Sequence, residues 1–167
     1  MITTTTNKTS GTTGTGAAQT IAFNFPVFAS TEVKVKKRLT STGAETLLTV
    51  TTDYTVSLTG TGSPNYTGGS ITTVTPFVAS TYTIHVYRET TETQSLDLIE
   101  NDALPAETVE ARFDKLFCLY ADLKEKVDRS LKFPITDSSL TSELPNSVDR
   151  ASETCKFDAS GNVTTAT

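Results

Sequence analysis

The residue types that perform acid–base, nucleophilic or metal chemistry are few in this chain and lie far apart. The single histidine, His85, falls in a run of alternating polar and apolar residues, out of phase with the apolar ones, which predicts a position on the surface of a strand. The two cysteines, Cys118 and Cys155, have no metal-binding or redox spacing. We expect both to be reduced thiols in a protein made in a cytosol.

The acidic and polar residues of "DASGN" are the other candidate for chemistry. Asp158, Ser160 and Asn162 offer oxygen ligands, but the remaining ligands and the closing glutamate of a calcium loop are missing. The composition favours a β-turn instead. With no phosphate-binding glycine loop and no nucleophile-elbow serine, we predict no catalytic residue, no cofactor site and no metal site.

The charge distribution argues against a nucleic-acid partner. The 167 residues carry a net charge of −5, and the excess of acid lies in residues 99–167, which hold eight basic and thirteen acidic side chains. Phosphate binding needs a basic surface, and only the short run Lys34, Lys36, Lys37 and Arg38 is basic. We read this run as a charged strand face. No apolar run is long enough to span a membrane, and the N-terminal sequence lacks the basic and apolar blocks of a signal peptide.

Residues 20–98 alternate apolar and polar side chains with period two. The apolar positions form short runs separated by turn sequences at 41–45, 59–69 and 75–80. This spacing predicts five to seven short antiparallel strands in a small β-sandwich. The preceding residues 1–19 contain few apolar side chains, so we expect them to be a flexible Thr/Gly-rich arm.

A different pattern begins after the predicted linker at 99–104. Pro105 suits a first helical position, and apolar residues then recur at steps of 4, 3, 4, 3 and 4. They are Val109, Phe113, Leu116, Tyr120, Leu123 and Val127. Phe117 and Leu131 widen the apolar stripe, which favours packing of more than two helices.

Two interpretations of this stripe compete. A helix that packs on its own sheet is the ordinary case, whereas a 3.5-residue period held through six positions favours self-association. We therefore predict an α+β protein, in which a small antiparallel β-sandwich head at 20–98 precedes a long helix at 105–133 that forms a parallel trimeric coiled coil. The polar residues 134–167 are expected to continue as an extended C-terminal tail.

The order of several short segments resembles a known family. "TTDYTV" at 51–56, "RETTETQ" at 88–94 and "LPAETVEARFDKL" at 104–116 are the most specific of them. Residues 20–133 closely resemble the N-terminal virion-anchoring domain of tail fibre proteins of short-tailed, autographivirus-type bacteriophages. "LPNSVDRASETCKFDASGN" is similar to the passage that often follows this domain.

The resemblance implies a non-enzymatic homotrimer located in the virion tail fibre and assembled in the host cytoplasm. Its partners would be the adaptor and nozzle proteins of the phage tail, and the fibre would serve host recognition and adsorption. Candidate docking residues are those of the basic run (Lys34, Lys36, Lys37, Arg38) and a loop with Pro64, Asn65 and Tyr66.

Complete fibres of this family continue into a shaft and a receptor-binding tip. This leaves the alternative of a short adaptor that carries a separate receptor-binding protein or depolymerase. A carbohydrate-binding sandwich is a further alternative, although the absence of tryptophan weighs against it. A carbohydrate-active enzyme would need paired carboxylates in a groove, and no spacing here predicts them.

Overall fold

The computed structural model describes residues 2, 4–60, 66–94, 96–97, 105–137, 144, 146–148 and 150–166. The chain divides into two compact units, residues Met1–Asp128 and Arg129–Thr167. The predicted linker at 99–104 lies outside the described residues, as do Pro64 and Asn65 of the predicted docking loop.

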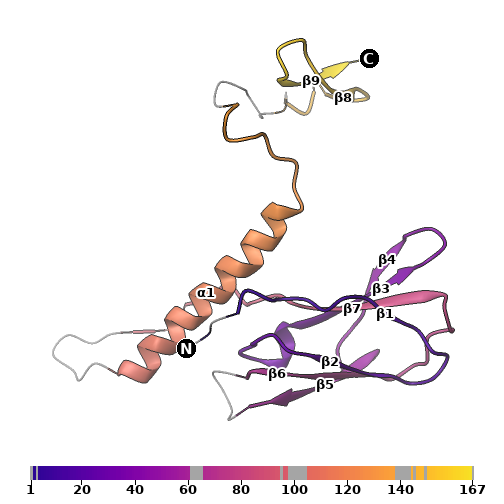
Figure 1. The fold of residues 1–167 in the computed structure, drawn as a ribbon, viewed down its shortest axis with the longest axis vertical. Helices are drawn as coiled ribbons and strands as arrows, with labels where there is room; N and C mark the ends of the chain where they lie inside the picture. The colour runs from indigo at the N-terminus through magenta and orange to yellow at the C-terminus, as the bar shows by residue number, and fades with distance from the viewer. Residues whose placement is uncertain are drawn as a thin grey trace. The chain divides into compact units, whose positions relative to one another are not determined.

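Two antiparallel sheets form a sandwich-like arrangement in the first unit (Figure 1). In the described residues, the first sheet has the order β1 (Thr12–Thr13), β7 (Tyr82–Arg88), β3 (Val33–Leu39) and β4 (Glu45–Leu47). The second has the order β2 (Thr20–Phe23), β6 (Gly68–Thr73) and β5 (Tyr54–Thr59). A short 3-10 turn, η1 (Ser30–Glu32), leads into β3. The period-two pattern of the sequence therefore did identify sheet structure.

Side chains that alternate along the strands meet between the two sheets. From β3 and β7, Val33, Val35, Ile84 and Val86 are fully buried, and Ile71 of β6 packs into the same core. Phe23 and Phe25 stack there with ring centroids 4.7 Å apart. The buried hydroxyl of Tyr54 donates a 2.8 Å hydrogen bond to the carbonyl of Val33, and desolvation by burial raises the pKa of this tyrosine.

The N-terminal arm is more ordered than the sequence predicted. Thr12 and Thr13 pair with β7 as an edge strand, and the chain before them follows the same strand. Thr9 N donates to Val86 O at 2.8 Å, and Arg88 N donates to the carbonyl of Asn7 at 2.7 Å. The expectation of a flexible arm rested on its lack of apolar side chains. A sheet edge instead holds the arm by backbone hydrogen bonds, which any residue type except proline can complete.

The predicted long coiled-coil helix is wrong. The helix α1 runs from Ala106 to Asp128, 23 residues, and Pro105 precedes it, accepting a hydrogen bond from Val109 N at 3.0 Å. Leu131, expected on the helical stripe, lies beyond the helix and is 95% exposed. One face of α1 is fixed against the sandwich of its own chain, so the helix is part of a compact head rather than a free rod.

The second unit contains a short hairpin of β8 (Thr154–Phe157) and β9 (Val163–Ala166). The turn predicted at "DASGN" joins the two strands, and Asp158 accepts hydrogen bonds from the backbone N–H groups of Ser160 and Asn162. These bonds lower the pKa of Asp158, the largest effect being the side-chain bond from Asn162. Phe133 contacts Phe157 edge to face, with ring centroids 6.3 Å apart. The C-terminal tail is thus partly folded rather than only extended.

Candidate interaction surfaces

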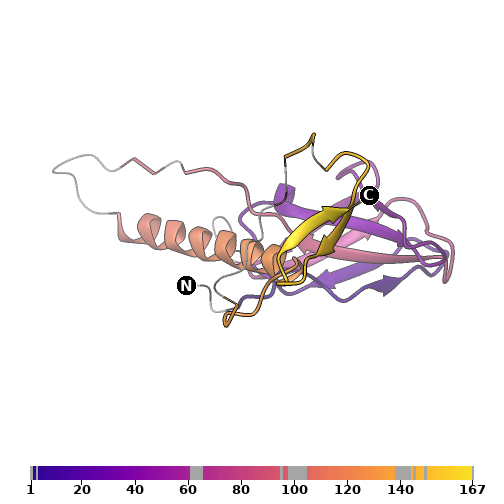
Figure 2. The same cartoon turned by 90° about the horizontal axis from the view of Figure 1, so that it is seen from above.

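The helix α1 has two faces of opposite character. The face toward the sandwich is made of small or polar residues that are buried: Ala111, Asp114, Cys118, Ala121 and Asp122. The other face carries the large apolar residues of the heptad stripe. In Figures 1 and 2 the N-terminal half of the helix reaches past the end of the sheets.

A buried ion pair fastens the helix to the sandwich. Arg88, at the end of β7, donates from Nη2 and Nε to Asp122 Oδ1 at 2.8 and 3.0 Å, and its side chain is fully buried. The remaining guanidinium bonds go to the carbonyls of Pro26 at 2.9 Å and Cys118 at 3.2 Å. Such a pair is costly to desolvate, and it persists only where hydrogen bonds satisfy both charges.

Asp122 is the centre of this network. Its Oδ2 accepts hydrogen bonds from the backbone N–H and the hydroxyl of Thr90, at 3.0 and 2.7 Å. Its Oδ1 also accepts a bond from Asn7 Nδ2 at 3.2 Å. The carboxylate therefore joins the N-terminal arm, the end of β7 and the helix, which fixes the rotation of α1 about its axis.

Contacts along the rest of the buried face extend this attachment. The backbone N–H of Ile2 donates to Asp114 Oδ1 at 2.8 Å, and Lys8 forms an ion pair with Glu125. On the opposite flank, Lys115 Nζ donates to the carbonyl of Thr93 at 2.6 Å. The N-terminal arm and the segment that follows β7 are therefore both attached to the helix.

Cys118 lies between these contacts and is completely buried. Burial raises the pKa of its thiol to about 11, so the thiol is protonated and unreactive near neutral pH. Cys155 is exposed in the second unit. The cysteine in the helix has a packing role.

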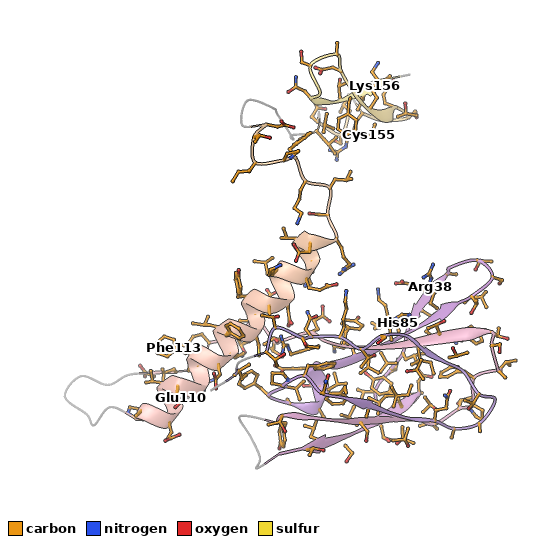
Figure 3. The ribbon with its side chains drawn as sticks, in the orientation of Figure 1. Arg38, His85, Glu110, Phe113, Cys155 and Lys156 are labelled. Carbon is orange, nitrogen blue, oxygen red and sulfur yellow. The ribbon has the colours of Figure 1, made fainter. Side chains whose placement is uncertain are left out.

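The apolar stripe of α1 faces away from the sandwich. Phe113, Leu116, Tyr120, Leu123 and Val127 are 66, 58, 59, 59 and 45% exposed, and Val109 is half-buried. Figure 3 shows Phe113 on the side of the helix opposite the sheets. The structure thus gathers all six predicted interface residues on one helix and leaves five of them largely open. We call this surface the apolar helix face.

The predicted basic docking run divides between the two faces of its sheet. Lys34, Lys36 and Arg38 alternate with the buried Val33 and Val35, so they lie on the outer face of β3. Lys37 points the other way, with Nζ 5.5 and 5.3 Å from the ring centroids of Phe77 and Tyr82. Of the predicted docking loop, Tyr66 is half-buried and its backbone pairs with Val27.

Sequence reasoning missed the residues that position the helix. Asp114, Cys118 and Asp122 occupy the helix face opposite the apolar stripe. The polar face of an amphipathic helix normally contacts solvent, so the sequence pattern did not indicate that these residues are buried. The available signal was Arg88, which is in phase with Ile84 and Val86 and is therefore a charge placed on the buried face of a strand. A buried arginine requires a carboxylate partner.

No group of three or more metal-ligating side chains occurs within the described residues. In the same part of the chain, no helix is long and apolar enough to cross a membrane. His85 lies half-buried on the outer face of β7. In comparisons with known proteins, no family model and no curated protein sequence matches this chain.

Proposed function

We propose that this protein is a structural component of a phage virion, the anchor portion of a tail fibre, which acts as a homotrimer. The observation that carries the proposal is the apolar helix face. A helix held against its own sandwich by a buried ion pair presents five large apolar side chains outward. Large apolar side chains exposed at regular intervals along one face are typical of an assembly interface.

A second copy of the same chain is the occupant that best fits this face. The exposed residues lie along one side of the helix, so the same face of a second copy can cover them with apolar side chains. This arrangement differs from a coiled-coil rod because each helix keeps its opposite face on its own head. The half-buried Phe117, on the flank of the stripe, broadens the surface and favours three copies over two.

The energy expected from this interface is moderate. Fully burying one large apolar side chain contributes about 1.5–3 kcal/mol, whereas association costs about 4–15 kcal/mol in lost translational and rotational freedom. Five of the stripe residues are 45–66% exposed in the single chain, so only that part of their surface remains to be covered. Trimer formation should therefore depend on protein concentration.

The role in a tail fibre is supported by the resemblance of residues 20–133 to virion-anchoring domains. In this proposal the sandwich heads dock on the adaptor and nozzle proteins of the tail, and the fibre serves host recognition and adsorption. Several trimers on one tail would bind the host with an avidity that exceeds each single contact.

The association state tests the interface directly. Sedimentation equilibrium of the full chain at micromolar concentration should show a trimer, and Leu116→Glu with Leu123→Glu should give monomers because carboxylates are introduced into an apolar contact. Thr108→Glu is the matched control, because Thr108 is exposed on the same helix but off the stripe. A wild-type chain that remains monomeric at 100-fold higher concentration would exclude the homotrimer.

The attachment role needs a separate measurement. Purified chain added to fibre-free tails of a short-tailed phage should appear as added density at the fibre position in electron micrographs. Tails that stay bare at a concentration where the chain is trimeric would contradict the virion role and leave the trimer standing.

A further inference from the structure

Basic side chains gather on the outer face of the first sheet. Lys34, Lys36 and Arg38 project from β3, and His85 of β7 lies directly opposite Lys36. Figure 3 shows Arg38 and His85 on the side of this sheet turned away from the second sheet. We call these four residues the basic face. Residues two apart on a strand are about 6.6–6.8 Å apart, so the charges follow each other at that interval.

The basic face already binds one carboxylate of its own chain. Lys36 Nζ forms an ion pair with Glu45 Oε2 at 3.0 Å, across to β4. The pKa of Glu45 is lowered, first by this hydrogen bond and the charge of Lys36, with smaller contributions from Arg38 and His85. The surface therefore favours the ionised form of a carboxyl group placed on it.

The surroundings of the basic face suit a protein contact. Tyr87 lies opposite Lys34, and Leu47, 56% exposed, lies opposite Lys36 on β4. His85 lies beside Gly11, the residue before the edge strand β1, where an added Cβ atom would come within 2.6 Å of the imidazole Cε1. Tyrosine and arginine are enriched in protein interfaces.

We infer that the basic face is the docking surface for a carboxylate-rich patch of a partner protein. This inference rests on the proposed function and specifies the chemistry of the tail partner: Asp and Glu side chains placed to reach Lys34 and Arg38, since Lys36 is paired with Glu45. It also narrows the candidate docking residues, because Lys37 points to the other side of the sheet and His85 joins the set.

A protein partner fits better than a phosphate polymer. The chain has a net charge of −5, and the excess of acid lies outside the sandwich. A long nucleic acid or an anionic membrane needs a basic surface much larger than these few side chains, whereas a discrete acidic patch does not. Screening at physiological salt limits the attraction to about 8 Å, which also favours a local contact.

The test uses a ten-residue glutamate peptide as the probe. Isothermal titration at low salt should detect its binding to the full chain, and Lys34→Glu with Arg38→Glu should weaken binding by about tenfold or more. The control, Lys132→Glu with Lys156→Glu, changes the net charge equally but lies in the second unit, and it should stay within about twofold of the wild type. Thermal melting should show that both variants fold.

Three results would overturn the inference. The first is that the peptide does not bind, and the second is that both double variants lose the same affinity for it. The third is that a duplex DNA of equal charge, or vesicles containing phosphatidylglycerol, bind more tightly than the peptide. Attachment to fibre-free tails separates this from the proposed function. Tails that bind the wild type and the Lys34→Glu, Arg38→Glu variant equally would refute the basic face alone. The other outcome is that tails bind neither the wild type nor this variant, while only the variant loses its affinity for the glutamate peptide. That outcome would refute the virion role alone.

Discussion

At the scale of single residues, the Arg88–Asp122 pair decides how the helix is presented. Asp122→Ala would leave the guanidinium of Arg88 buried without a counter-charge and would remove two bonds to Thr90. We expect the free energy of unfolding to fall by about 3–5 kcal/mol, measured by urea denaturation.

The control for this prediction is another ion pair on the same helix. Lys124 and Asp128 form a pair four residues apart, but both side chains are about half-exposed, at 52 and 48%. Asp128→Ala should therefore cost less than about 1 kcal/mol. If both variants lose the same free energy of unfolding, the buried Arg88–Asp122 pair stabilises the fold no more than an exposed pair does.

At the scale of elements, the N-terminal arm is expected to act as a strap on the helix. Deleting residues 1–9 would remove the bonds from Ile2 and Asn7 to the helix and uncover the backbone of β7 near Val86 and Arg88. Each lost hydrogen bond contributes about 1 kcal/mol, so the melting temperature should drop clearly. Amide exchange in the last turns of α1 should rise as well.

A point substitution provides the comparison for the deletion. Thr6→Ala changes an exposed side chain within the same arm and should leave the melting curve unchanged. Asn7→Ala, which removes only the bond to Asp122, should fall between the two. If the deletion melts like the wild type, the arm is not a strap, and the original expectation of a flexible arm would be right.

The elements that the sequence predicted are those defined by periodic apolar side chains. Alternation identified the strands around Val35, Ile71 and Ile84, and the heptad spacing identified the helix. Periodicity could not show which helix face meets the sandwich, because that depends on contacts between residues far apart in the chain. Asn7 and Asp122, for example, are 115 residues apart. The apolar stripe suggested a rod, whereas polar bonds on the other face fix α1 to its head.

At the scale of the whole molecule, a symmetric assembly makes a geometric prediction. Around a three-fold axis the same stripe residue of each copy approaches the axis, so a cysteine introduced there meets its equivalent. Leu116→Cys, in a background where the exposed Cys155 is changed to serine, should form disulfides between copies under mild oxidation. Three cysteines around one axis form one disulfide and leave one thiol, so the product should be a covalent dimer plus a monomer.

The geometry of the disulfide makes this test selective. A disulfide requires Cα atoms about 4.4–6.8 Å apart, which random collision in solution rarely holds. Thr108→Cys in the same background is the control, because it is exposed on the same helix away from the stripe. The buried Cys118 is protonated and does not compete, since its pKa is raised to about 11. Cross-linking that is no faster at Leu116 than at Thr108 would show that the apolar helix faces do not meet one another, and the assembly would have to be built through another surface.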